Sequence, residues 1–176
     1  MPICFAYGSN MLPARLAARC ATARLVGPGR ATGFAIRFDK GGMDGSGKAT
    51  LWPGPAAVPG VLYRLSDADL VTLDAYEGVG RGYARREIDI LTPDGPARAY
   101  AYIADQPVEG LLPFDWYVAL ILAGALIHAL PSDHLAMLAA VPHQPDPDPD
   151  RPGRIAALQA LAAHGFDGPD AVLRAG

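Results

Sequence analysis

The chain has 176 residues, 51% of them hydrophobic, and a formal net charge of −3. These values predict one domain with a single core, and the scattered Lys and Arg residues form no basic stripe for nucleic acid. Its two cysteines, Cys4 and Cys20, are too few for a disulfide framework and lack metal-ligand spacing. The first residues are unlike a signal peptide, and the most apolar segment, residues 116–127, is shorter than the roughly 20 residues of a membrane span. We therefore expect a cytoplasmic protein that does not bind membranes.

The first third of the chain is predicted to be mainly strands. Alternating apolar residues predict a strand over residues 2–7, which ends in the turn Tyr7-Gly8-Ser9-Asn10. Asn10 is a candidate N-cap for a short helix over residues 11–19. Further strand-like runs occupy residues 23–26, 32–38, 49–52 and 59–65, separated by Gly- and Pro-rich breakers.

The remaining elements become progressively more helical. Ser66 and Asp69 have the spacing of a capping box and predict a helix that ends at Gly78. Two alternating runs, residues 83–91 and 97–103, are joined by a turn sequence and predict a β-hairpin. Helices are predicted over residues 114–130, 132–141 and 154–163, with the Pro/Asp repeat of residues 142–152 as a stiff, exposed spacer.

This order of elements indicates an α+β protein rather than repeated βαβ units. We expect the main domain to cover residues 1–141. Residues 142–176 should add the Pro/Asp-rich spacer and a C-terminal helix that packs on the same domain.

Two motifs point to other functions, but their context does not support them. Residues 42–48 nearly complete a phosphate-binding loop, yet Ala49 stands where Ser or Thr should bind Mg²⁺, and a strand is predicted where a helix should follow. Ser9 lies outside a G-x-S-x-G elbow, and no histidine can be placed beside it from sequence. The four histidines also lack metal-ligand spacing, so no metal site is expected.

Glu77 is the carboxylate with the most unusual predicted position. Of the three glutamates, Glu87 falls on a solvated strand face and Glu109 in a loop, whereas Glu77 falls in the last turn of a helix. There it faces the negative end of the helix dipole, which disfavours its ionised form by a few tenths to about 1 kcal/mol. Such locally unfavourable choices concentrate at functional sites. An exposed Glu77 with a small penalty is the simple alternative.

Two segments in register resemble the signature of the γ-glutamylcyclotransferases: Tyr7-Gly8-Ser9-Asn10-Met11 and, about 65 residues later, Leu73-Asp74-Ala75-Tyr76-Glu77-Gly78-Val79. Shorter matches extend the resemblance over residues 2–141. It implies a compact mixed β-barrel with flanking helices that requires neither metal nor cofactor. It also implies an acyltransferase that cyclises the γ-glutamyl group of an amino acid, peptide or amine to 5-oxoproline and releases the free amine.

The resemblance also implies roles for individual residues. Glu77 would be the general base, which takes a proton from the substrate's α-ammonium group and delivers it to the leaving nitrogen. The predicted substrate-binding residues are Cys4, Phe5, Ala6, Tyr7, Gly8, Ser9, Asn10, Tyr83, Tyr102 and Tyr117. Each tyrosine could instead be a half-buried core residue.

Three expectations concern the partners of the chain. Arg81 is a candidate for recognising an acidic leaving group. The expected partner is a small γ-glutamyl molecule, and a homodimer is a further candidate. The alternative function is a non-catalytic binding module that retains the cyclotransferase fold.

Overall fold

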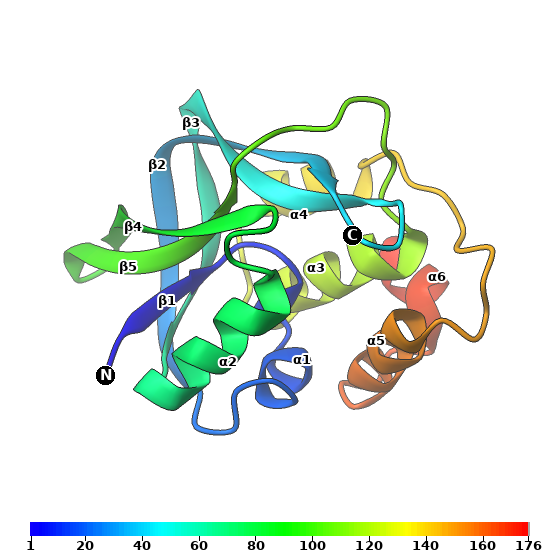
Figure 1. Cartoon of the computed structure of the whole chain (residues 1–176), viewed down its shortest axis with the longest axis horizontal. Helices are drawn as coiled ribbons and strands as arrows, with labels where there is room; N and C mark the ends of the chain where they lie inside the picture. The colour runs from blue at the N-terminus through cyan, green and yellow to red at the C-terminus, as the bar shows by residue number, and fades with distance from the viewer. Residues whose placement is uncertain (176) are drawn as a thin grey trace.

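The strands close into a five-stranded barrel in the computed structural model, which describes residues 1–175 (Figure 1). The order around the barrel is β1-β3-β2-β4-β5. The strands are β1 (Ile3–Ala6), β2 (Arg24–Gly41), β3 (Gly47–Arg64), β4 (Tyr83–Thr92) and β5 (Gly95–Ala104). All pairs are antiparallel except β1 with β5. The predicted α+β class, a mixed barrel with flanking helices, is confirmed.

β2 and β3 are each one long strand, so the prediction of four short strands in these regions is wrong. The Gly- and Pro-rich segments do not interrupt the strands. Instead, the register of β2 against β3 shifts between Leu25 and Gly27 and again between Thr32 and Phe34. Gly27 and Gly33 have positive φ angles of 154° and 79°, which suits glycine at such β-bulges. The bulges let two strands of 18 residues curve around the barrel.

The helix that carries Glu77 forms as the sequence predicts. α2 (Asp67–Glu77) begins where the Ser66 hydroxyl accepts a hydrogen bond from the Asp69 N–H at 3.0 Å. It ends at Gly78, whose φ of 67° is left-handed. Glu77 is therefore the last helical residue, and a cap at each end of the helix defines the bounds of α2.

The segment after β1 differs from its prediction. Residues Ser9–Met11 form a 3₁₀ turn, η1, and α1 (Pro13–Ala17) begins only after Leu12. Asn10 is therefore not an N-cap. Its side-chain amide donates to Glu77 instead, so the polar group predicted to cap a helix faces the functional site.

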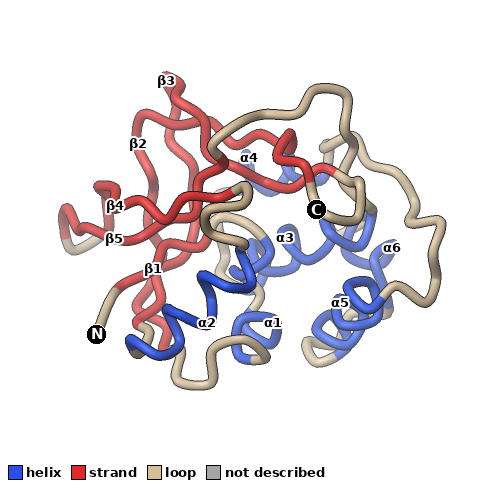
Figure 2. Tube along the Cα trace, in the orientation of Figure 1, coloured by secondary structure: helices blue, strands red, loops and turns tan. Residues whose placement is uncertain are grey.

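α3 (Asp115–Ile127) is the central helix of the helical layer. Ten of its thirteen residues are buried, which explains a composition that is apolar on all sides. Three helices pack against it: α4 (Ser132–Ala139), α5 (Pro152–Ala162) and α6 (Gly168–Leu173), of which α6 has no counterpart among the predicted helices. Figure 2 shows strands gathered on one side of the molecule and most helices on the other. Within residues 1–175, no helix has both the length and the apolar character that crossing a bilayer requires.

One aspartate attaches the Pro/Asp-rich segment to α3. The Asp146 side chain has no exposed surface and accepts hydrogen bonds from Trp116 Nε1 at 2.8 Å and Arg151 Nε at 2.7 Å. Burial alone would raise the pKa of Asp146, but the hydrogen bonds from Arg151, from the Asp148 N–H and from Trp116 lower it to about 2, from an ordinary 3.8. The segment is mostly exposed, as predicted, but it is held at this buried carboxylate.

Asp146 should therefore make stability depend on pH in the acid range. Because the folded pKa is depressed, its contribution is complete above about pH 4 and is lost as pH falls through about 2. We expect Asp146→Asn to lower the free energy of unfolding near neutral pH, and the difference from wild type to shrink as pH falls. Urea unfolding over this range measures it. Asp148→Asn is the control, since Asp148 forms no ion pair within residues 1–175; an equal effect of both variants would contradict the prediction.

Candidate functional site

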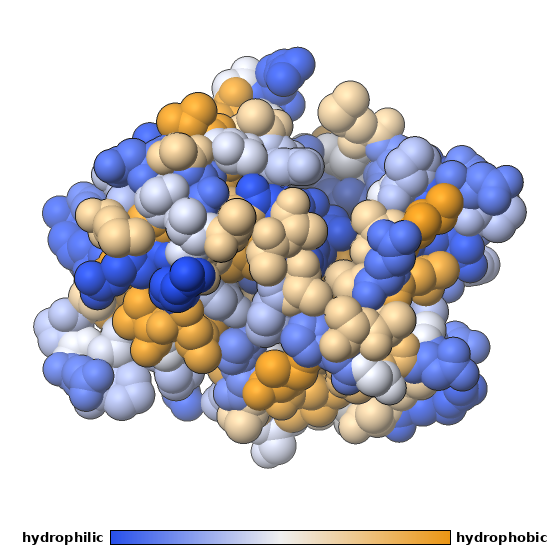
Figure 3. Space-filling view, turned by 90° about the horizontal axis from the view of Figure 1, so that it is seen from below, coloured by the Kyte–Doolittle hydropathy of each residue, from blue (hydrophilic) through white to orange (hydrophobic). Residues whose placement is uncertain are grey.

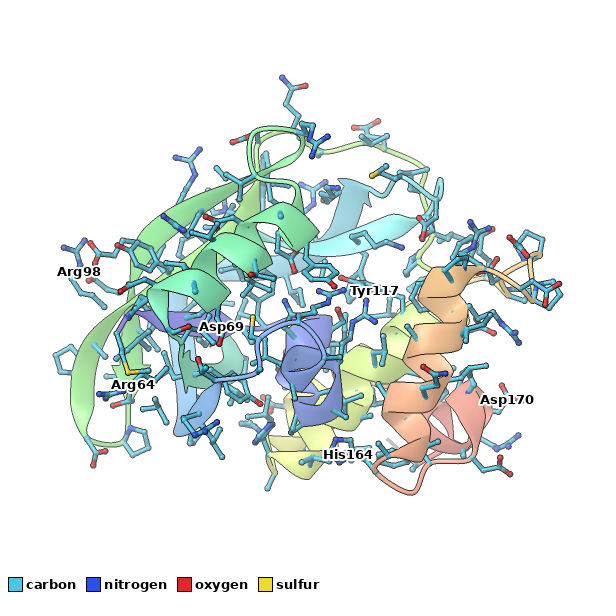
Figure 4. All side chains as sticks on the ribbon, turned by 60° about the horizontal axis from the view of Figure 1, so that its bottom comes forward. Arg64, Asp69, Arg98, Tyr117, His164 and Asp170 are labelled. Carbon is cyan, nitrogen blue, oxygen red and sulfur yellow. The ribbon has the colours of Figure 1, made fainter. Side chains whose placement is uncertain are left out.

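A pocket open to solvent lies where β1 ends, between the following loop, the end of α2 and the first turn of α3. It brings together all the predicted site residues: Glu77, the seven residues Cys4 to Asn10, and the tyrosines 83, 102 and 117. Leu16, Ala49, Tyr63, Leu65 and Leu73 complete its lining. Figure 4 shows Tyr117 near the centre of the molecule, between α1, α2 and the strands. Segments that are far apart in sequence therefore converge on one pocket.

The turn after β1 exposes its backbone to this pocket. Cys4, Phe5 and Ala6 are buried in β1, whereas Gly8 lies at the turn into η1. A Cβ atom at Gly8 would stand 3.7 Å from the Tyr117 hydroxyl oxygen, so glycine leaves this part of the pocket open. Within residues 1–175 the Gly8 N–H has no hydrogen-bond acceptor. Gly8 therefore lines the pocket with a backbone N–H that no described residue uses.

Glu77 is held by two side chains that contact the same oxygen. Its Oε1 accepts from Asn10 Nδ2 at 2.8 Å and lies 3.2 Å from Arg19 Nη1. Arg19 also donates to Asn10 Oδ1 at 2.9 Å, which completes a three-residue cluster. The Arg19 charge offsets the unfavourable end of the α2 dipole. Glu77 is only 15% exposed, and no residue of the described chain bonds Oε2, which leaves this oxygen for a substrate.

The tyrosines of the pocket differ in how their hydroxyl groups are used. The Tyr117 hydroxyl oxygen accepts a hydrogen bond from the Ala49 N–H at 3.1 Å. Its O–H hydrogen has no acceptor among the described residues. In contrast, Tyr83 donates to the Ala49 carbonyl at 2.6 Å, Tyr102 donates to Asp74 at 2.8 Å, and Tyr7 donates to the Tyr102 carbonyl. Burial raises the pKa of Tyr117 to about 12, although the Ala49 hydrogen bond opposes it. Tyr117 is therefore a neutral hydrogen-bond donor at physiological pH.

Two arginines of the site were not predicted from the sequence. Arg15 donates from Nε to the Ser9 hydroxyl at 3.1 Å, and Arg19 binds Glu77 as described. Burial, and then the neighbouring Arg19 charge, lower the pKa of Arg15 to about 10, so it stays cationic at neutral pH. In the helix predicted over residues 11–19 their i, i+4 spacing would put both on one face, although α1 ends at Ala17 and Arg19 lies in the turn that follows it. Ser9 thus binds an arginine, and the described chain places no histidine at hydrogen-bond distance from it.

A further unpredicted contact fixes the end of α2 against the barrel. Asp74 accepts from the Tyr102 hydroxyl at 2.8 Å and forms an ion pair with Arg85 of β4. Because Asp74 precedes Glu77 by about one helical turn, these bonds hold the last turn of α2, with Glu77, at the pocket. Within residues 1–175, no three His, Cys, Asp or Glu side chains converge into a candidate metal site.

Comparisons with known proteins agree with this arrangement. The family model described as "Gamma-glutamyl cyclotransferase, AIG2-like" matches residues 4–117. The chain is 30% identical over 146 residues to the γ-glutamylcyclotransferases of Mus musculus and Homo sapiens, which covers 78% of this chain and 77% of each relative. A solved structure named "Gamma-glutamyl cyclotransferase" superposes with a TM-score of 0.80 at 25% identity, covering 92% of this chain and 98% of the other. The resemblance seen in the sequence is thereby confirmed, and the chain belongs to the γ-glutamyl cyclotransferase, AIG2-like family.

Proposed function

We propose that this chain is an active γ-glutamylcyclotransferase, which converts a γ-glutamyl amino acid, peptide or amine into 5-oxoproline and the free amine. One observation carries the proposal: Glu77 Oε2 and the Tyr117 O–H, both without partners among the described residues, face one pocket beside the Gly8 turn. A base, a neutral donor and a free backbone N–H are the groups that an intramolecular acyl transfer requires. Family membership supports the same reaction.

The reaction begins with proton transfer to Glu77. The substrate's α-ammonium group loses a proton to Oε2, and the resulting amine attacks the γ-carbonyl carbon of the same glutamyl group. The new C–N bond closes a five-membered ring, and the carbonyl oxygen becomes an oxyanion. The Gly8 N–H and the Tyr117 hydroxyl are the candidate donors to this oxygen, each worth about 10²- to 10³-fold in rate if it acts as an oxyanion-hole donor.

The second half returns the proton. As the oxyanion collapses, the original amide C–N bond breaks and Glu77 delivers its proton to the leaving nitrogen. The ring nitrogen passes its extra proton to the released amine, which leaves as an ammonium ion, so the enzyme returns to its starting state. A folded substrate supplies much of the rate, since well-oriented intramolecular attack reaches effective molarities of about 10⁵–10⁸ M. The buried walls formed by Tyr83, Tyr102 and Phe5 suit this role because they restrict the conformation of the glutamyl chain.

The direct test is release of 5-oxoproline from a panel of γ-glutamyl dipeptides and γ-glutamyl amines. We expect the wild-type chain to release 5-oxoproline and free amine in equal amounts from at least one donor. If no donor yields 5-oxoproline, while calorimetry still detects binding of a γ-glutamyl compound, the chain is a binding module that retains the fold.

A further inference from the structure

The chain contains only two lysines, and both stand at the same end of the barrel, beside the pocket. Lys40 and Lys48 are direct partners across the β2–β3 pair, next to the connecting turn. Each ammonium group lies over an aromatic ring of the pocket: Lys40 is 4.8 Å from the Tyr83 ring centroid and Lys48 is 4.8 Å from that of Tyr117. The two lysines differ in what else they bind.

Lys48 is fully engaged by its own hairpin. Its Nζ lies 2.7 Å from Asp44 Oδ2 and 2.6 Å from Ser46 Oγ, and it is also within 5.2 Å of the Trp116 ring centroid. Residues 42–48 therefore form a closed ion-paired turn, and the strand β3 starts at Gly47. A phosphate-binding loop is followed by a helix. The strand found here agrees with the prediction that residues 42–48 are not such a loop.

Lys40 has no such partner. Within residues 1–175 it forms neither an ion pair nor a hydrogen bond, although it is half-buried. Its ammonium group lies against the backbone of Gly82, where a Cβ atom would stand 3.2 Å from Nζ and 3.0 Å from Cε. Burial lowers the pKa of Lys40, while the charges of Glu77 and Asp44 oppose this shift. An unpaired, partly desolvated cation is thus placed within electrostatic reach of the candidate base.

Lys40 and Arg15 approach the pocket from different sides. In Figure 1 the end of the β2–β3 hairpin lies above α3, whereas α1, which carries Arg15, lies below it. Arg15 is bonded to Ser9, in the turn proposed to bind the glutamyl group. Lys40 instead adjoins the Tyr83 ring and Gly82. With the glutamyl group at the Ser9 turn, as in the proposed function, Lys40 is the cation available to the leaving group.

The chemistry of possible leaving groups suits such a cation. In a γ-glutamyl amino acid the scissile nitrogen is followed by one carbon and then a carboxylate, which leaves with the released amino acid. A simple γ-glutamyl amine has no negative charge at this place. On the basis of the proposed function, we propose that Lys40 binds the carboxylate of the leaving amino acid, and thereby selects γ-glutamyl amino acids over γ-glutamyl amines without a carboxylate. A hydrogen bond between charged groups is worth about 10- to 100-fold in such a selection.

Two donors that differ only in this carboxylate test the inference: γ-glutamyl-alanine and γ-glutamyl-ethylamide. For the wild type we expect kcat/KM to be about 10- to 100-fold higher with the alanine donor. Lys40→Met should remove most of this preference by lowering kcat/KM for γ-glutamyl-alanine, with little change for the ethylamide. Lys40→Arg keeps the charge and should retain part of the preference.

Arg81→Met is the matched comparison, because Arg81 is the other cation considered for an acidic leaving group but is exposed in the adjoining loop, whereas Lys40 is half-buried over the ring of the pocket residue Tyr83. Its preference ratio should equal that of the wild type. If Arg81→Met removes the preference and Lys40→Met does not, Arg81 rather than Lys40 reads the carboxylate. Equal wild-type kcat/KM for the two donors, or equal losses on both donors in Lys40→Met, would overturn the role of Lys40 but leave the proposed function intact. Failure of the wild type to release 5-oxoproline from these two donors and from every other donor of the panel would overturn both.

Discussion

Replacing Glu77 with Gln should lower kcat for 5-oxoproline release by about 10²- to 10⁴-fold, the usual contribution of a positioned general acid–base group. Glutamine retains the shape of the side chain and an oxygen that accepts from Asn10, so the site geometry should persist. It cannot take a proton from the substrate's ammonium group. Initial rates at saturating donor measure the effect, and thermal unfolding checks that the variant is folded.

Glu87→Gln is the matched control for this substitution. Glu87 lies in β4, is about half exposed, and pairs with Arg98 on the outside of the barrel. We expect its kcat to stay within about twofold of wild type, because surface ion pairs contribute little. Equal activity of wild type and Glu77→Gln would show that Glu77 is not the base.

Gly124→Ala should destabilise the protein by about 1–3 kcal/mol, as overpacked cores usually are. Gly124 lies in α3 where the helix touches the turn that follows β1. An added Cβ would stand 2.7 Å from Met11 Cβ and 2.8 Å from the Leu12 backbone nitrogen, both closer than real contacts allow. The methyl group must therefore push η1 away from α3, and with it the Gly8 turn. We expect a lower urea midpoint and a lower kcat/KM in the same variant.

Gly153→Ala in α5 is the control, because no loss of stability is expected there. A Cβ at Gly153 would meet only Trp116, at an ordinary 3.6 Å, and the position is helical. Gly153→Ala should therefore be neutral or stabilise by up to about 1 kcal/mol. If Gly124→Ala were equally harmless, α3 and the turn would not be packed as tightly as the distances indicate.

Local signals predicted the elements whose structure depends on few neighbours. The Ser66 cap and Gly78 stop define α2 by themselves, and the turn at residues 93–95 defines the β4–β5 hairpin. The continuity of β2 and β3 was not predictable in this way. Gly27 and Pro28 look like a break in isolation, but each takes a place opposite β3 once that strand is present. A bulge is a property of a strand pair, not of one sequence.

In the site, too, local signals predicted some residues, whereas others depend on contacts between distant segments. The glycine turn and Glu77 were predicted because a resemblance and a helix-end position single them out. Arg19 was missed because its spacing to Arg15 does not reveal that the turn after α1 meets the end of α2 at Glu77. The separate roles of the lining residues, the division at residue 141, the cytoplasmic location and a homodimer stay predictions.

On the face shown in Figure 3, hydrophobic residues form small groups separated by hydrophilic ones.

The two hydrogen bonds at Ala49 have a consequence for how substrate range can change. Its N–H binds Tyr117 and its carbonyl binds Tyr83, so a single residue of β3 sets the distance between two aromatic walls. β3 is paired along its length with β2 and also with β1, and a wider gap would require the whole sheet to move. The positions of the Tyr83 and Tyr117 walls are thus tied to barrel geometry, whereas the turn of the β2–β3 hairpin and the loop of residues 78–82 lie outside the paired strands. Selection for new leaving groups would act on those two surface segments.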